Sequence, residues 1–202
     1  MDARTWLRFP DGPRNTPALF GVGEPLPIHW SGDLNEFHDV ELTIRAIQFG
    51  TGLVFGDTYD SLEPPHAGLS PELDALAAYM DSIEVPISPY GDNRDTVKRG
   101  EIQFAALGCQ SCHTPPLFTD RQLHEVGTGD PTKERDSHGR GTNFDTPSLR
   151  ALWSTAPYFH DGNAANLVDV FQTGTVHDIS AYVTAEEMEA LIAYLMALPL
   201  NE

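Results

Sequence analysis

The feature that most constrains this chain is one short run, Gly108-Cys109-Gln110-Ser111-Cys112-His113. The chain has two cysteines in all, so neither can pair with a cysteine elsewhere in it. A Cys-x-x-Cys-His run is the attachment signature of c-type haem, because the two thiols add to the two vinyl groups on one porphyrin edge. The next residue, His113, then reaches the iron from one face as the proximal ligand. The run therefore predicts one covalently attached haem c, and redox chemistry rather than simple binding.

Three other uses of the cysteine pair fit less well. A thioredoxin-type redox pair needs a strand–helix context, and no strand-like run precedes Cys109. A zinc site needs two further ligands; His113 and His124 are available, but their spacing matches no common zinc finger. A disulfide across two intervening residues would be strained and would stabilise little.

Helical patterns flank the motif on both sides. Residues 95–107 indicate a short helix with Asp95 as its N-cap. The run Thr184-Ala-Glu-Glu187 is a capping box that opens a terminal helix, whose apolar positions follow the i, i+3, i+4, i+7 pattern. We expect the two helices to cross beside the haem motif, with Phe104 and Tyr194 as contacts. Gly (17 residues) and Pro (16 residues) predict long loops between the helices.

The chain is strongly acidic, with 30 acidic against 12 basic residues and a formal net charge of −18. Such a surface repels nucleic acid and anionic membranes, and it attracts a basic partner such as a small cationic electron carrier. Solubility alone would also explain this charge, so the charge does not identify a partner. No apolar run is long enough to cross a bilayer, so no membrane span is expected, and Met1 to Pro10 shows no secretory signal pattern.

An internal repeat relates the two halves of the chain. Residues 16–40 align with residues 146–170 at a constant offset of 130, with seven identities in 25 positions, where average residue usage gives about one or two. The helical run 71–80 likewise resembles 187–196. In the second copy Cys109 lies 37 residues before Thr146. The position 37 residues before Thr16 would lie upstream of Met1. We therefore expect a longer two-haem protein with its first haem motif upstream. The alternative is a natural mono-haem protein whose first half decayed into a cap.

Two stretches after the haem motif carry a family resemblance. They are Phe144-Asp-Thr-Pro-Ser-Leu-Arg150 and Ala156-Pro-Tyr-Phe-His-Asp-Gly162, and their first-half counterparts are Arg14-Asn-Thr-Pro-Ala-Leu19 and His29-Trp30-Ser-Gly32. The chain resembles the bacterial di-haem cytochrome c peroxidases and their MauG-like relatives over roughly residues 12–198.

The resemblance implies an all-α fold of two cytochrome c-like modules. The first module, residues 1–84, is incomplete and lacks a haem motif; residues 85–94 form a linker, and residues 95–202 form the haem domain. The family implies a periplasmic location, an electron-donor protein (a small cytochrome or a cupredoxin) and hydrogen peroxide as the final electron acceptor. It also implies a calcium ion between the modules, which Asn15 and carbonyls near Thr146 match loosely. Association into a homodimer is a further expectation.

Two departures from the family pattern concern the ligand and the catalytic groups. The family's second haem usually takes a distal Met after the His-Asp-Gly motif, but residues 163–178 hold no Met, and His177 is the available donor. His160, His124 and a vacant site remain as alternatives, and Met188 is assigned to the core. Near Trp30 the best candidates for the peroxide-cleaving groups are Glu36 and His38, although the pattern favours a solvated helix residue at each position. A MauG-like oxidation of a protein or organic substrate, and a plain mono-haem electron carrier, stay open as functions.

Overall fold

The computed structural model describes residues 15–16, 18–21, 23, 27–32, 34–40, 67–131 and 141–200. Helices are the main regular elements in these ranges, and the two short strands, β1 and β2, pair antiparallel. Within these ranges the structure is therefore helical with few strands, as an all-α cytochrome c-like fold requires, while the division of the chain into two modules stays a prediction. The elements in chain order are η2 (Phe37–Asp39), α2 (Pro71–Asp81), α3 (Arg94–Ala106), η3 (Cys109–Ser111), β1 (Leu123–His124), β2 (Phe144–Asp145), η5 (Leu152–Ser154), α4 (Leu167–Val170) and α5 (Ala185–Ala197), where η marks a 3-10 helix.

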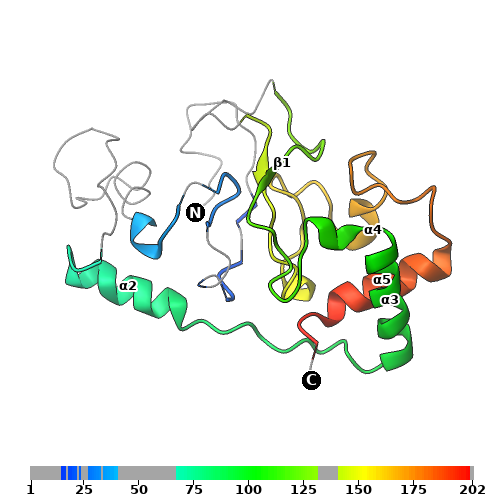
Figure 1. The fold of residues 1–202 in the computed structure, drawn as a ribbon, viewed down its shortest axis with the longest axis horizontal. Coiled ribbons are helices and arrows are strands. Elements are labelled where there is room, and N and C mark those ends of the chain that lie inside the picture. Colours follow the sequence, from blue (N-terminus) through cyan, green and yellow to red (C-terminus); the bar gives the residue numbers. More distant parts are fainter. Residues whose placement is uncertain are drawn as a thin grey trace.

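The core lies where α3 and α5 cross. In Figure 1 these two helices and α4 gather at one end of the molecule, and an extended segment leads from α2 at the other end into α3. The rings of Phe104 on α3 and Tyr194 on α5 lie 5.4 Å apart, centre to centre, and Phe118 packs within 6.5 Å of both. The predicted contact between Phe104 and Tyr194 is confirmed.

The helix cap predicted from the sequence is confirmed at α5 and is wrong at α3. Thr184 and Glu187 form the predicted capping box, with each side chain bonded to the other residue's backbone. At α3 the N-cap is Asn93, whose side chain accepts from the N–H of Thr96, so the assignment of this cap to Asp95 is wrong. Asp95 lies in the first helical turn instead, where its charge still favours the positive end of the helix dipole.

The sequence repeat has a structural counterpart in two loops, one in each half of the chain. Isolated antiparallel bridges join Ile28 to Leu34 and Tyr158 to Ala164. In each loop the residue after the first bridge partner has a positive φ, 74° at His29 and 66° at Phe159. Each loop then enters a short helix, η2 or α4, through a capping box closed by an aspartate at equivalent positions. The two halves therefore share backbone geometry as well as identities.

None of the helices in the described ranges has both the length and the apolar character to cross a bilayer.

Candidate haem site

The two cysteines lie on one tight turn that begins where α3 ends. Gly108 takes a left-handed φ of 74°, which glycine adopts without a Cβ clash, and it turns the chain out of α3 into η3. The N–H of His113 donates to the carbonyl oxygen of Cys109 at 2.9 Å and closes the turn. Both thiols are free and partly accessible, and burial raises the pKa of Cys109. The turn thus presents two thiols and one imidazole from five consecutive residues.

The backbone around it holds the ring of His113. Its Nδ1 lies 3.1 Å from the carbonyl oxygen of Phe118, and Pro147 is a second backbone partner of the ring. With the proton on Nδ1, Nε2 would carry the lone pair that a metal needs. Burial lowers the pKa of His113 to about 4. The imidazole is therefore neutral near pH 7, which is the form that binds iron.

The ring of His177 faces this site. Its centre lies 6.4 Å from that of His113, at an interplanar angle of 47°. Burial lowers the pKa of His177 as well, and its buried Nδ1 has no hydrogen-bond partner among the described residues. A metal–nitrogen bond of about 2.0 Å puts two imidazoles on one metal with ring centres about 6 Å apart. The residues present thus fit a haem that takes one imidazole on each side.

The other two candidate histidines are engaged elsewhere. His160 is 2% exposed and stacks on Phe144 at 3.9 Å between ring centres, which fits a structural role. His124 bonds through Nε2 to Asp120 at 2.7 Å. Ligand atoms of Cys112, Asp120 and His124 all lie within 4.8 Å of one another. This group differs from the zinc alternative considered above, which used His113 and His124. This trio needs Cys112 as a free thiolate, which haem attachment would consume.

Glu36 and His38 lie at the η2 turn and are held by neighbouring groups. The Nε2 of His38 lies 2.9 Å from Oδ1 of Asp74 on α2, and Glu36 takes part in the capping box of η2 with Asp39. The contact of His38 with Asp74 joins η2 to α2. A catalytic role for either residue stays a prediction.

Asn15 contacts the second half of the chain, although not at Thr146. Its side-chain amide donates to the carbonyl oxygens of Pro157 and Phe159, whereas the carbonyl of Thr146 accepts from the hydroxyl of Thr119 at 2.6 Å. The expected calcium site at Asn15 and Thr146 stays a prediction. The contact of Asn15 with Pro157 and Phe159 was not predicted from the sequence. The internal repeat was the signal that pointed to these segments, because Asn15 directly precedes one copy and Pro157 and Phe159 lie in the other.

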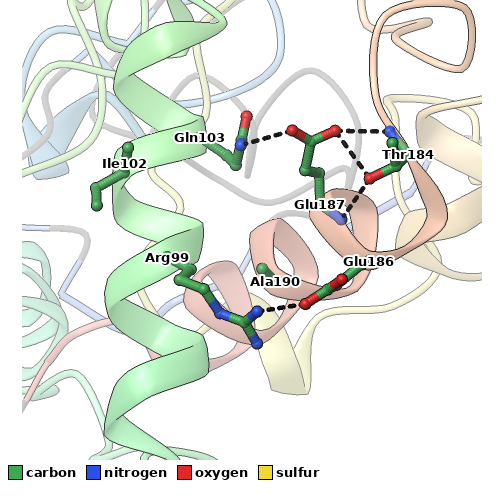
Figure 2. A pocket seen from close by; sticks show the side chains of 7 residues that line it. All are labelled: Arg99, Ile102, Gln103, Thr184, Glu186, Glu187 and Ala190. Atoms are coloured by element: carbon green, nitrogen blue, oxygen red, sulfur yellow. Dashed lines mark hydrogen bonds and ion pairs between the residues drawn. The ribbon is translucent and has the colours of Figure 1, made fainter.

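A hollow of about 320 Å³ lies between α3 and α5. Figure 2 shows its polar rim, in which Arg99 pairs with Glu186 and Gln103 bonds to Glu187. Its lining contains no cysteine or histidine. We therefore assign these contacts to helix packing and not to the redox site.

Several known proteins are similar to the chain in sequence, although no protein-family model matches it. The chain is 30% identical to hydrazine synthase subunit gamma of Kuenenia stuttgartiensis (62% of this chain, 48% of the relative) and 26% identical to methylamine utilization protein MauG of Methylorubrum extorquens (77% and 53%). It is 25% identical to cytochrome c551 peroxidase of Nitrosomonas europaea (61% and 42%). The chain thus spans about half the length of these curated relatives.

A solved structure supports the fold. It is described as a MauG-like protein associated with microbial copper homeostasis, and it superposes with a TM-score of 0.64 over 92% of this chain and 75% of its own, at 18% sequence identity. At 18% sequence identity this similarity supports the fold alone. The function has to be argued from the residues of the site.

Proposed function

We propose that this chain, which belongs to the cytochrome c peroxidase and MauG-like family, transfers single electrons through one haem c. Cys109 and Cys112 would tether the haem, His113 would ligate its iron on the proximal side, and His177 would ligate it on the other. The observation that carries the proposal is the facing pair of neutral imidazoles, His113 and His177, whose rings lie 6.4 Å apart beside both thiols.

The residues have separate tasks in this scheme. When bound, haem supplies an iron that cycles between two oxidation states. The bond from His113 Nδ1 to the carbonyl of Phe118 fixes the ring's tautomer and direction. Phe159 packs on the apolar core and contacts the ring of His177; it would limit the access of water to this side, which is one of the protein's means of setting a haem potential. A His/His pair gives a lower potential than a Met/His pair.

The finer part of the proposal is the electron's destination. We extend the proposal to a small cytochrome as donor, hydrogen peroxide as acceptor and a periplasmic location; the similarity to a cytochrome c551 peroxidase supports it. The net charge of −18 favours a basic donor. Peroxide reduction, the calcium ion and homodimer formation would belong to the whole protein, and Glu36 and His38 are the groups proposed to move protons in it.

A plain electron carrier is the second candidate, and one observation favours it. His113 and His177 face each other; if both ligated one iron, no position would be open, and peroxide needs an open iron to react. Under this alternative the chain would pass electrons without cleaving peroxide.

The test is the visible spectrum of the full chain, co-expressed with haem-attachment machinery. We expect sharp bands after dithionite that survive denaturation, and their native form should be lost in a His113→Ala variant. A prompt Soret shift with peroxide would support peroxidase chemistry, and its absence would support the electron carrier. Colourless protein would overturn the proposal altogether.

A further inference from the structure

A second group of metal-binding side chains lies beside the proposed haem tether. The thiol of Cys112, the carboxylate of Asp120 and the imidazole of His124 offer ligand atoms that all lie within 4.8 Å of one another. One sulfur, one carboxylate oxygen and one imidazole nitrogen are ligand types that zinc takes in proteins. The group is separate from His113 and His177, the proposed iron ligands.

The fold holds Asp120 and His124 through contacts that do not involve Cys112. The N–H of Gln122 donates to Oδ1 of Asp120 at 3.0 Å, and Oδ2 of Asp120 lies 2.7 Å from Nε2 of His124. His124 lies on β1, opposite Phe144 of β2. Hydrogen bonding and strand pairing therefore place a carboxylate and an imidazole side by side, next to the thiol.

The separations suit a zinc ion after a small adjustment. Bonds of about 2.0–2.3 Å in a tetrahedral arrangement put ligand atoms about 3.4–3.6 Å apart. The oxygen of Asp120 and the nitrogen of His124 would move slightly apart to reach this separation. Their side chains are 18% and 36% exposed, so an ion can enter from solvent, and a water molecule can take the fourth position.

Haem attachment and zinc binding make opposite demands on Cys112. Attachment adds its S–H across a haem vinyl group: an S–C bond forms, the proton goes to the other vinyl carbon, and the C=C π bond is consumed with no electron lost or gained. Zinc binding instead releases the thiol proton to solvent and keeps the sulfur as a thiolate. Because the thiolate is the metal ligand, the thioether of an attached haem no longer provides it.

We propose that Cys112, Asp120 and His124 form a zinc site in the chain before haem is attached, and that zinc and haem compete for Cys112. The competition rests on the proposed function, in which Cys112 tethers the haem, whereas the metal site itself does not. The supply of zinc would then regulate how much of the chain acquires haem.

Cobalt(II) is the probe for the site, because it replaces zinc in such sites and absorbs visible light. The full-length chain, purified without haem under reducing conditions, is titrated with cobalt and then with zinc. We expect a sulfur-to-cobalt charge-transfer band in the wild type, which zinc abolishes. Cys112→Ser should lose the band. His124→Ala and Asp120→Asn should weaken cobalt binding at least about tenfold, which is the cost of losing even an outer-shell partner. Asp120→Asn keeps the shape of its side chain and covers the case in which His124→Ala disturbs β1.

Two variants of the neighbouring haem motif are the matched controls. Cys109→Ser and His113→Ala leave all three proposed ligands in place, so each should bind cobalt as the wild type does. If they weaken cobalt binding as much as His124→Ala does, the ion is bound by the Cys-x-x-Cys-His run and the proposed site is overturned. A wild-type chain that gives no cobalt band also overturns it.

Competition is measured as the fraction of the chain that carries covalent haem after co-expression with haem-attachment machinery at increasing zinc concentrations. Zinc should lower this fraction in the wild type and should need about tenfold higher concentration to do so in Asp120→Asn. An equal response of the two proteins would show that zinc acts elsewhere and would overturn the competition. If neither protein attaches haem without added zinc, the proposed function and the competition both fail, while the cobalt titration still decides the metal site.

Discussion

The backbone N–H of Asp145 donates to the carbonyl oxygen of Trp30 at 2.8 Å. Their counterparts in the repeat, Asn15 and His160, make the same bond at 2.7 Å with the halves exchanged. This is the pattern of an isologous interface, in which residue i of one copy meets residue j of the other and the converse also holds. The two repeats therefore contact each other about a local pseudo-twofold axis, through one backbone hydrogen bond in each direction.

Removal of the two thiols should separate haem binding from haem attachment. A Cys109→Ser, Cys112→Ser double variant should lose all colour from the unfolded polypeptide after extraction with acidified acetone, because no thioether can form. Each single variant should keep one thioether and a shifted reduced band. Ser111→Ala, on the same turn, serves as the control and should behave as wild type. Haem that resists extraction from the double variant would disprove the covalent assignment.

The two histidines after Tyr158 should differ in their effect on the iron. His177→Ala should convert the ferric haem from low spin to high spin, since it removes the imidazole facing His113. His160→Ala should leave the spin state unchanged but lower the free energy of unfolding, because its ring is buried and stacks on Phe144. Absorption spectra and denaturant titrations measure the two effects. The reverse assignment would follow if His160→Ala alone changed the spin state.

Gly100 should resist a substitution that normally stabilises helices. Glycine to alanine within a helix gains about 1 kcal/mol. At Gly100 on α3, however, an added Cβ would collide with the carbonyl oxygen of Ala190 and lie 2.6 Å from Cβ of Tyr194 on α5. We expect Gly100→Ala to destabilise the protein by about 1–3 kcal/mol through overpacking of the crossing.

The control for that crossing is Gly91→Ala. No described atom lies within 4 Å of the position that its Cβ would take, so the free energy of unfolding should change by about 0.5 kcal/mol or less. Urea titrations compare the two variants. Equal stability of both would show that α3 and α5 are not packed as closely as described.

The capping box of α5 predicts that one substitution, at Thr184, changes both the free energy of unfolding and the pKa of Glu187. The N–H of Thr184, and then its hydroxyl, lower the pKa of Glu187. Thr184→Ala should cost about 1 kcal/mol and raise the pKa of Glu187 only part of the way toward its usual value, because the backbone N–H of residue 184 still donates. Because the folded pKa is lowered, the stabilisation from Glu187 is complete above the unfolded value and is lost as pH falls through the folded value.

NMR titration of Glu187 and thermal melts at two pH values check this. Thr184→Ser retains the hydroxyl and should restore both properties. An unchanged pKa of Glu187 in Thr184→Ala would show that the bond from the Thr184 hydroxyl to Glu187 does not form.

Local signals in the sequence predicted local structure. The capping box at Thr184 fixed the start of α5, because its bonds join residues three positions apart. Asn93 was missed as the cap of α3, since Asp95 is an equally good capping residue and the choice depends on where the preceding chain arrives. The pairing of β1 with β2 was also missed, because two-residue strands from distant segments carry no periodic pattern.

The sequence by itself determined the chemistry: two cysteines and a histidine at fixed spacing, which one turn brings together whatever the rest of the chain does. It also determined the repeat, whose offset of 130 recurs in the backbone of the two loops. The tertiary structure alone decided which histidine faces His113, since His177 lies far along the chain from it. It alone decided that Asn15 reaches Phe159. Both contacts join distant residues, and such contacts form only when the whole core packs, so no local preference encodes them.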